Sequence, residues 1–80
     1  MLELGQSPSQ PAADLIKEGG EATFMTDVVD ASQDVPVIVD FWAPWCGPCK
    51  TLGPMLEQAV TAANGRVKMV KIDVDENQRL

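Results

Sequence analysis

The sequence contains two cysteines, separated by two residues, in the segment Trp45-Cys46-Gly47-Pro48-Cys49. At the start of a helix this spacing places the two Cα atoms roughly 5–6 Å apart, which is the separation that a disulfide needs. The pair can therefore alternate between dithiol and disulfide with little backbone movement. Cys46, at the first turn, would point its sulfur toward free backbone N–H groups and the positive end of the helix dipole, which stabilise a thiolate. We expect Cys46 to be the nucleophile and Cys49, one turn deeper, to be the resolving thiol.

Two other uses of the cysteines are compatible with this spacing. A Cys-x-x-Cys pair can form half of a structural zinc site, but zinc takes four ligands and the sequence has no histidine and no further cysteine. A zinc site would therefore need two chains. The cysteines could also be inert core residues, although the Gly-Pro insert and the flanking Trp42 and Trp45 argue against this. The absence of histidine excludes a Cys–His nucleophile pair of the protease kind.

Polar and aromatic candidates lie near the pair. Asp40 interrupts an apolar run six residues before Cys46, and burial would favour its neutral form, which suits a group that takes and returns a proton. At a frayed strand end Asp40 would instead be merely polar. Lys71, on a later strand, is either its cationic partner or a solvated charge. Trp42 fits the core, whereas Trp45 offers an apolar contact surface for a protein substrate.

The segments on either side of the cysteines predict a buried strand followed by a helix. Residues 35–39, Val-Pro-Val-Ile-Val, form a β-branched run that is typical of a strand buried on both faces. After the cysteines, apolar residues recur at three- and four-residue spacing, which predicts one apolar helix face made of Leu52, Met55, Leu56, Ala59, Val60 and Ala63. Pro54 lies inside this helix and should kink it. Asn64-Gly65 should end the helix, because both residues tolerate the left-handed conformation.

The remaining segments predict two further strands and a further helix. Residues 14–18 could form a short edge strand, and residues 21–32 a helix with Phe24, Val28 and Val29 on one face. Residues 66–74 alternate between apolar and polar types, which predicts a strand with two different faces. Asp75 is a candidate N-cap for another helix.

This order of elements predicts an α/β fold. Strands joined through helices pair in parallel, so the order corresponds to a β-α-β-α-β unit over residues 14–80. Residues 1–13, rich in Pro, Ser and Gln, have little apolar surface to bury, and we interpret them as a flexible lead-in.

Charge and hydropathy limit the possible partners. The formal net charge is −6, from twelve acidic and six basic side chains, and no basic run is present, which argues against nucleic acid. No apolar run approaches the ~18–20 residues of a membrane span. The N-terminus lacks the basic and apolar regions of a secretory signal. We therefore expect no nucleic acid, no membrane and a cytoplasmic, reducing compartment.

Residues 39–50, Val-Asp-Phe-Trp-Ala-Pro-Trp-Cys-Gly-Pro-Cys-Lys, resemble the active-site segment of the thioredoxin family. The resemblance extends to Pro54 and to residues 71–75, Lys-Ile-Asp-Val-Asp, and covers about residues 14–80. It implies a thioredoxin-like fold with Cys46 as nucleophile, Cys49 as resolving thiol, Asp40 as buried proton acceptor for Cys49, and Lys71 beside Asp40. It also implies an active-site surface for substrates, formed by Trp42, Trp45, Gly47 and Pro48.

The same resemblance implies a function and its partners. It indicates a protein disulfide reductase, active in electron transport and cell redox homeostasis, that needs no cofactor beyond the Cys46–Cys49 pair. Its partners would be protein disulfide substrates and an upstream dithiol reductase as electron donor. The alternative is a thioredoxin-fold binding or chaperone module of a larger protein.

The sequence also differs from a complete thioredoxin. Members of the family continue with a helix, a cis-proline loop, two antiparallel strands and a final helix. We therefore expect these residues to be a thioredoxin-like unit truncated before the cis-proline loop and the C-terminal β-β-α segment. The strand at 35–42 would then keep an open edge, through which the chain could associate with itself.

Overall fold

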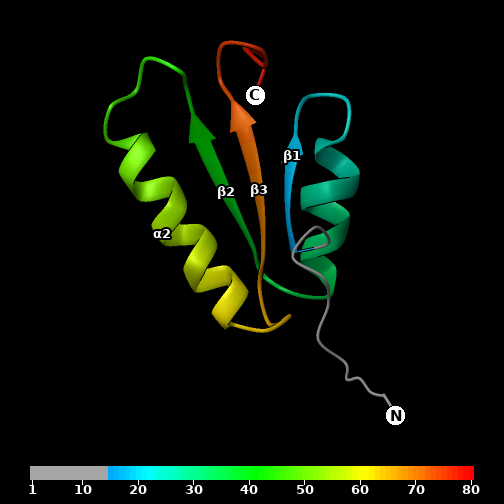
Figure 1. Cartoon of the computed structure of the whole chain (residues 1–80). Coiled ribbons are helices and arrows are strands. Elements are labelled where there is room, and N and C mark those ends of the chain that lie inside the picture. Colours follow the sequence, from blue (N-terminus) through cyan, green and yellow to red (C-terminus); the bar gives the residue numbers. More distant parts are fainter. Residues whose placement is uncertain (1–14) are drawn as a thin grey trace.

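The computed structural model describes residues 15–80, which form a three-stranded sheet with helical segments beside it (Figure 1). The strands are β1 (Ile16–Gly19), β2 (Val37–Trp42) and β3 (Lys68–Asp73). All pair in parallel, in the order β1-β3-β2. The predicted parallel β-α-β-α-β unit is confirmed, and β1 is an edge strand as expected. The predicted lead-in, residues 1–13, lies outside the described residues.

The strand that leads to the cysteines is an edge strand within the described part of the chain. β2 is hydrogen-bonded to β3 on one side, so the expected open edge is present. Val37, Ile38 and Val39 are only half-buried, and the prediction that this run is buried on both faces is therefore wrong. The strand also begins two residues later than predicted, after Pro36, which has no N–H and whose carbonyl accepts a hydrogen bond from the Lys68 backbone.

The central strand is β3, which is buried on both faces. Met69 packs on one face with Leu15 and with Val60 of α2 (Cys49–Ala62), and these three residues form the buried core cluster. Val70 and Ile72, on the other face, are also buried. The alternation of residue types predicted a strand with two different faces. Instead both faces are buried, because a central strand in a layered fold meets elements on both sides.

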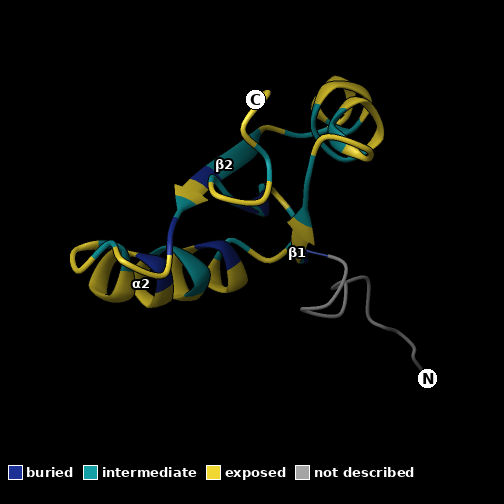
Figure 2. Ribbon diagram, turned by 90° about the horizontal axis from the view of Figure 1, so that it is seen from above, coloured by how far each residue is buried: buried dark blue, intermediate teal, exposed yellow. Residues whose placement is uncertain are grey.

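The helical segments lie on opposite faces of the sheet (Figure 2). The predicted helix over residues 21–32 is observed as η1 (Met25–Asp30), a π-helix, followed by η2 (Ala31–Gln33), a 3-10 turn. Apolar spacing could not distinguish these from an α-helix, because the periods differ by less than one residue per turn. Neither segment contains a fully buried residue.

The long helix α2 follows the prediction at its C-terminal end, but it begins at Cys49 and leaves Cys46 outside its first turn. It contains Pro54 and ends at Ala62, and the backbone then turns through Asn64 (φ 59°) and Gly65 (φ 95°). Only part of its predicted apolar face is covered: Leu56 and Val60 pack on the core, whereas Leu52 and Met55 are exposed.

Residues 74–80 lie in turns and form no helix. The prediction that Asp75 caps a further helix is therefore wrong. No helix among residues 15–80 combines the length and the apolar character needed to cross a membrane.

Candidate active site

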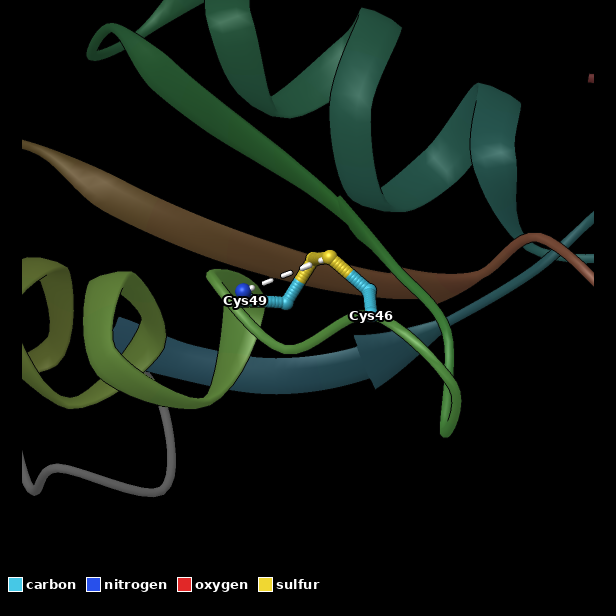
Figure 3. Close-up of a disulfide and its surroundings, with 2 residues drawn as sticks. All are labelled: Cys46 and Cys49. Carbon is cyan, nitrogen blue, oxygen red and sulfur yellow. Dashed lines mark hydrogen bonds between the residues drawn. A yellow bond between two sulfur atoms is a disulfide. The ribbon is translucent and has the colours of Figure 1, made fainter.

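The two cysteines lie where the chain passes from β2 into α2, and a disulfide joins them (Figure 3). Their Cα atoms are 5.4 Å apart, which confirms the separation predicted from the spacing. The backbone N–H of Cys49 donates a hydrogen bond to Cys46 Sγ, with an N···S distance of 3.3 Å. Both residues are half-buried. Cys46 is therefore partly exposed as a residue, and its sulfur is already in contact with a backbone donor.

The position of Cys46 relative to the helix differs from the prediction. Because α2 begins at Cys49, Cys46 lies in the preceding turn, and Cys49 is the first helical residue rather than one turn deeper. The turn is closed by hydrogen bonds from Cys46 N–H to the Ala43 carbonyl (3.0 Å) and from Lys50 N–H to the Gly47 carbonyl (3.1 Å). Cys46 Sγ nevertheless contacts the N-terminal end of the helix, since the N–H that it meets is one of the helix's unsatisfied donors.

An exposed surface borders the pair. The side chain of Trp45 is 73% exposed, and Gly47 and Pro48 are exposed beside it. The indole N–H of Trp45 donates a hydrogen bond to Asp75 Oδ2 at 2.9 Å, and the Asp75 backbone N–H is held by Asp73 Oδ1 at 2.9 Å. Sequence reasoning missed this role of Asp75, because the two partners are 30 residues apart and no local pattern joins them.

A cavity of about 340 Å³ lies between α2 and the sheet. Asp40, Trp42 and Cys49 line it together. Asp40 is 7% exposed, so the predicted burial of this carboxyl group is confirmed and a frayed strand end is excluded. Trp42 is half-buried, and within the described residues its buried indole Nε1 has no hydrogen-bond partner. In residues 15–80 no three His, Cys, Asp or Glu side chains are grouped so as to hold a metal ion.

Lys71 lies in the same cavity but pairs with a residue that the sequence did not suggest. Its Nζ is 2.8 Å from Glu57 Oε2, on α2. This hydrogen bond raises the pKa of Lys71; desolvation opposes the rise, and the charges of Glu57, Glu18 and Asp40 add to it. Asp40 is the residue beside Lys71 in the strand register, yet the direct partner is Glu57. The expectation of an Asp40–Lys71 pair or a solvated Lys71 is therefore corrected to an ion pair with Glu57.

Comparison with known proteins identifies the family. Residues 16–80 match the family model described as Thioredoxin. The chain belongs to the thioredoxin family. It is 45% identical over 60 residues to Thioredoxin 1 of Nostoc sp., an alignment that covers 75% of this chain and 54% of that protein. It is 50% identical over 58 residues to the thioredoxin of Bacillus subtilis, covering 72% of this chain and 55% of that protein.

A solved thioredoxin structure supports the same fold. The crystal structure of chloroplastic thioredoxin z superposes with a TM-score of 0.71 and 45% sequence identity, over 80% of this chain and 55% of that one. The thioredoxin-like fold predicted from residues 39–50 is therefore confirmed. The chain spans about half the length of the curated relatives that it matches.

Proposed function

We propose that this chain carries the dithiol–disulfide centre of a protein disulfide reductase. The observation that carries the proposal is the Cys46–Cys49 disulfide at the start of α2, in which a helix N–H already contacts Cys46 Sγ. Membership of the thioredoxin family supports it. A backbone donor of this kind stabilises a thiolate, so the reduced form would have a nucleophile ready at Cys46.

The reaction follows from the roles of the two thiols. In the dithiol form the Cys46 thiolate attacks a disulfide of a protein substrate, forms a mixed disulfide and releases one substrate thiolate, which takes a proton. Cys49 then loses its proton and attacks Cys46 Sγ, which forms the Cys46–Cys49 disulfide and releases the second substrate thiol. Two electrons pass from the chain to the substrate. An upstream dithiol reductase is the donor that would restore the dithiol form.

The surrounding residues take supporting roles in this proposal. Asp40 accepts the proton of Cys49, since both line one cavity and the carboxyl group is buried. Lys71 contributes charge to the same cavity. The substrate contacts Trp45, Gly47 and Pro48, which are exposed beside the disulfide, and Trp42, which is half-buried and lines the cavity with Cys49. Residues 14–80 would form the redox unit, with residues 1–13 as a lead-in, and the reaction would serve electron transport and redox homeostasis in the cytoplasm.

The experiment is reduction of a model disulfide protein by this chain, with a small dithiol as electron source. The wild-type chain should accelerate the reduction, and Cys46→Ser should lower the rate to the uncatalysed background. Cys49→Ser is the matched variant, because it keeps the nucleophile and should accumulate a mixed disulfide detectable by mass spectrometry. Reduction that persists in Cys46→Ser, or a mixed disulfide formed through Cys49 instead, would refute the assignment.

The exposed apolar side chains favour a second candidate, a binding or chaperone module. Phe41 on β2, Leu52 and Met55 on α2, and Trp45 are each 49% exposed or more. Such surface is suited to contacts with unfolded chains or, through the edge of β2, with a second copy. Client binding or concentration-dependent sedimentation that is unchanged in the Cys46→Ser/Cys49→Ser variant would favour this candidate.

A further inference from the structure

The cavity beside Cys49 gathers charged groups from every element that surrounds it. Glu18 comes from β1, Asp40 from β2, Lys71 from β3, and Lys50 and Glu57 from α2. Three carboxylates therefore share this space with two ammonium groups. The exposure differs across the cavity: Asp40 is buried, whereas the side chains of Lys71 and Glu57 are 26% and 36% exposed and lie at its rim.

Three carboxylates are placed so that they could form an ion pair with Lys71. In the strand register it lies between Glu18 of β1 and Asp40 of β2, and Glu57 approaches from the helix above. Cα partners on adjacent strands project to the same face, so Glu18 and Asp40 are both within reach of its charge. The direct contact, at 2.8 Å, is to Glu57 Oε2. Glu57 therefore competes with Asp40 for this ammonium group and holds it at the rim.

We propose that Glu57 is a positioning residue for the second thiol step, because it keeps the Lys71 ammonium away from the carboxylate that accepts the proton of Cys49. The inference rests on the proposed function. A carboxylate paired directly with an ammonium group is a weaker base than a free one. With Glu57 in place, the Asp40 carboxylate takes the Cys49 proton and the Cys49 thiolate attacks Cys46 Sγ. The departing substrate thiolate then takes a proton, which Asp40 can return.

The test isolates the Cys49 step. The reduced chain is mixed in a stopped-flow instrument with excess chromogenic aromatic disulfide, which releases one coloured thiol when Cys46 attacks and a second when Cys49 displaces the first adduct. The second phase is unimolecular, so its rate depends neither on protein-substrate recognition nor on an electron donor. The rate of this second phase is measured as a function of pH for the wild type, Glu57→Gln, Glu57→Asp and Glu18→Gln. The variants are compared by the acidic limb of this pH–rate profile, which is the range in which the rate falls as the pH is lowered.

The expected result is specific to Glu57. In Glu57→Gln, Lys71 is free to approach Asp40. The acidic limb of the rate profile should therefore move to a pH about 1 unit lower, the shift typical of a new opposite charge nearby. The plateau rate should fall roughly threefold, because a weaker base transfers the proton less effectively. Glu57→Asp retains the carboxylate and should restore most of the wild-type profile. Glu18→Gln removes a charge from the same cavity without touching the ion pair and should produce less than half of the shift.

A double-mutant cycle with Lys71→Gln separates positioning from simple charge removal. In the Lys71→Gln background, Glu57→Gln should no longer move the limb. The inference is overturned if Glu57→Gln leaves the profile unchanged, if Glu18→Gln shifts it equally, or if the effect of Glu57→Gln persists without Lys71. If the wild type shows no second phase, the proposed function itself fails and the inference falls with it. The two failures are therefore distinguishable.

Discussion

Replacing Gly53 by alanine should stabilise the protein, although Gly53 is buried in α2 against the active-site cavity. A glycine inside a helix costs about 1 kcal/mol relative to alanine. A Cβ at this position would have Asp40 Oδ2, at 3.8 Å, as its nearest neighbour, which is an ordinary van der Waals contact. The free energy of unfolding should therefore rise by about 1 kcal/mol, which corresponds to a Tm increase of about 4–8 °C for a domain of this size.

The same substitution at Gly19 should have the opposite effect. A Cβ there would lie 2.6 Å from Val70 Cγ1, and Val70 is buried at 2% exposure and has a stiff β-branched side chain. Gly19→Ala should lower the free energy of unfolding by about 1–3 kcal/mol, as overpacked core positions do. Gly47→Ala is the neutral member of the series, because nothing lies within 4 Å of its Cβ position, and it should change stability by less than about 0.5 kcal/mol.

Thermal unfolding of the oxidised chains at one fixed concentration, followed by far-UV circular dichroism, measures all three variants. The expected order of Tm is Gly53→Ala, then wild type and Gly47→Ala together, then Gly19→Ala. A Gly53→Ala protein that melts below the wild type would refute the argument that the space beside Asp40 can accept a methyl group. A neutral Gly19→Ala would show that β1 and β3 are not as closely packed as the Val70 contact requires.

Two further predictions concern the charged contacts. Because the Glu57 hydrogen bond raises the pKa of Lys71 above 10.5, the ion pair contributes stability that is fully present below that pH and is lost as pH rises through the raised value. Glu57→Gln should remove roughly 0.5 kcal/mol of stability at pH 8, and less once the pH rises through the raised pKa of Lys71. Urea unfolding at a series of pH values measures this loss. Equal losses at pH 8 and above pH 11 would contradict the prediction. Asp75→Ala removes the acceptor for the Trp45 indole N–H and should lower the fluorescence anisotropy of Trp45 in a Trp42→Phe background. Asp75→Asn keeps a side-chain oxygen and should retain the anisotropy, and equal anisotropy in the two Asp75 variants would count against the hydrogen bond.

The parts of the site that depend on neighbouring residues were predictable from the sequence. The two-residue separation of Cys46 and Cys49 fixes their Cα distance through the geometry of a single turn. Asn64 and Gly65 adopt the left-handed conformation because of their own steric properties. In both cases the geometry is determined by residues that are close together in the sequence, so a local sequence pattern predicts it.

The predictions that were wrong concern contacts between residues far apart in the chain. The partner of Lys71 is set by which α2 side chain lies above β3, and nothing in the sequence around residue 71 specifies Glu57. Burial of β2 was overestimated because a β-branched run indicates strand preference, whereas its exposure depends on which strands pair with it. Burial of Asp40 was one of two outcomes that the sequence left open, and it follows from the position of Asp40 within β2, where its side chain lines the cavity beside α2.

The two thiols therefore depend on the fold to different degrees. Cys46 Sγ accepts a hydrogen bond from a backbone N–H three residues away, within a turn that closes on itself. Cys49 lines a cavity whose charged groups come from three strands and a helix, so its proton loss in the proposed reaction would require the sheet to be formed. Loosening the sheet, for instance by overpacking β1 at Gly19 beside Glu18, should affect the Cys49 step before the Cys46 step. In the proposed reaction, attack by Cys46 would therefore depend on local structure, whereas resolution of the mixed disulfide by Cys49 would depend on tertiary structure.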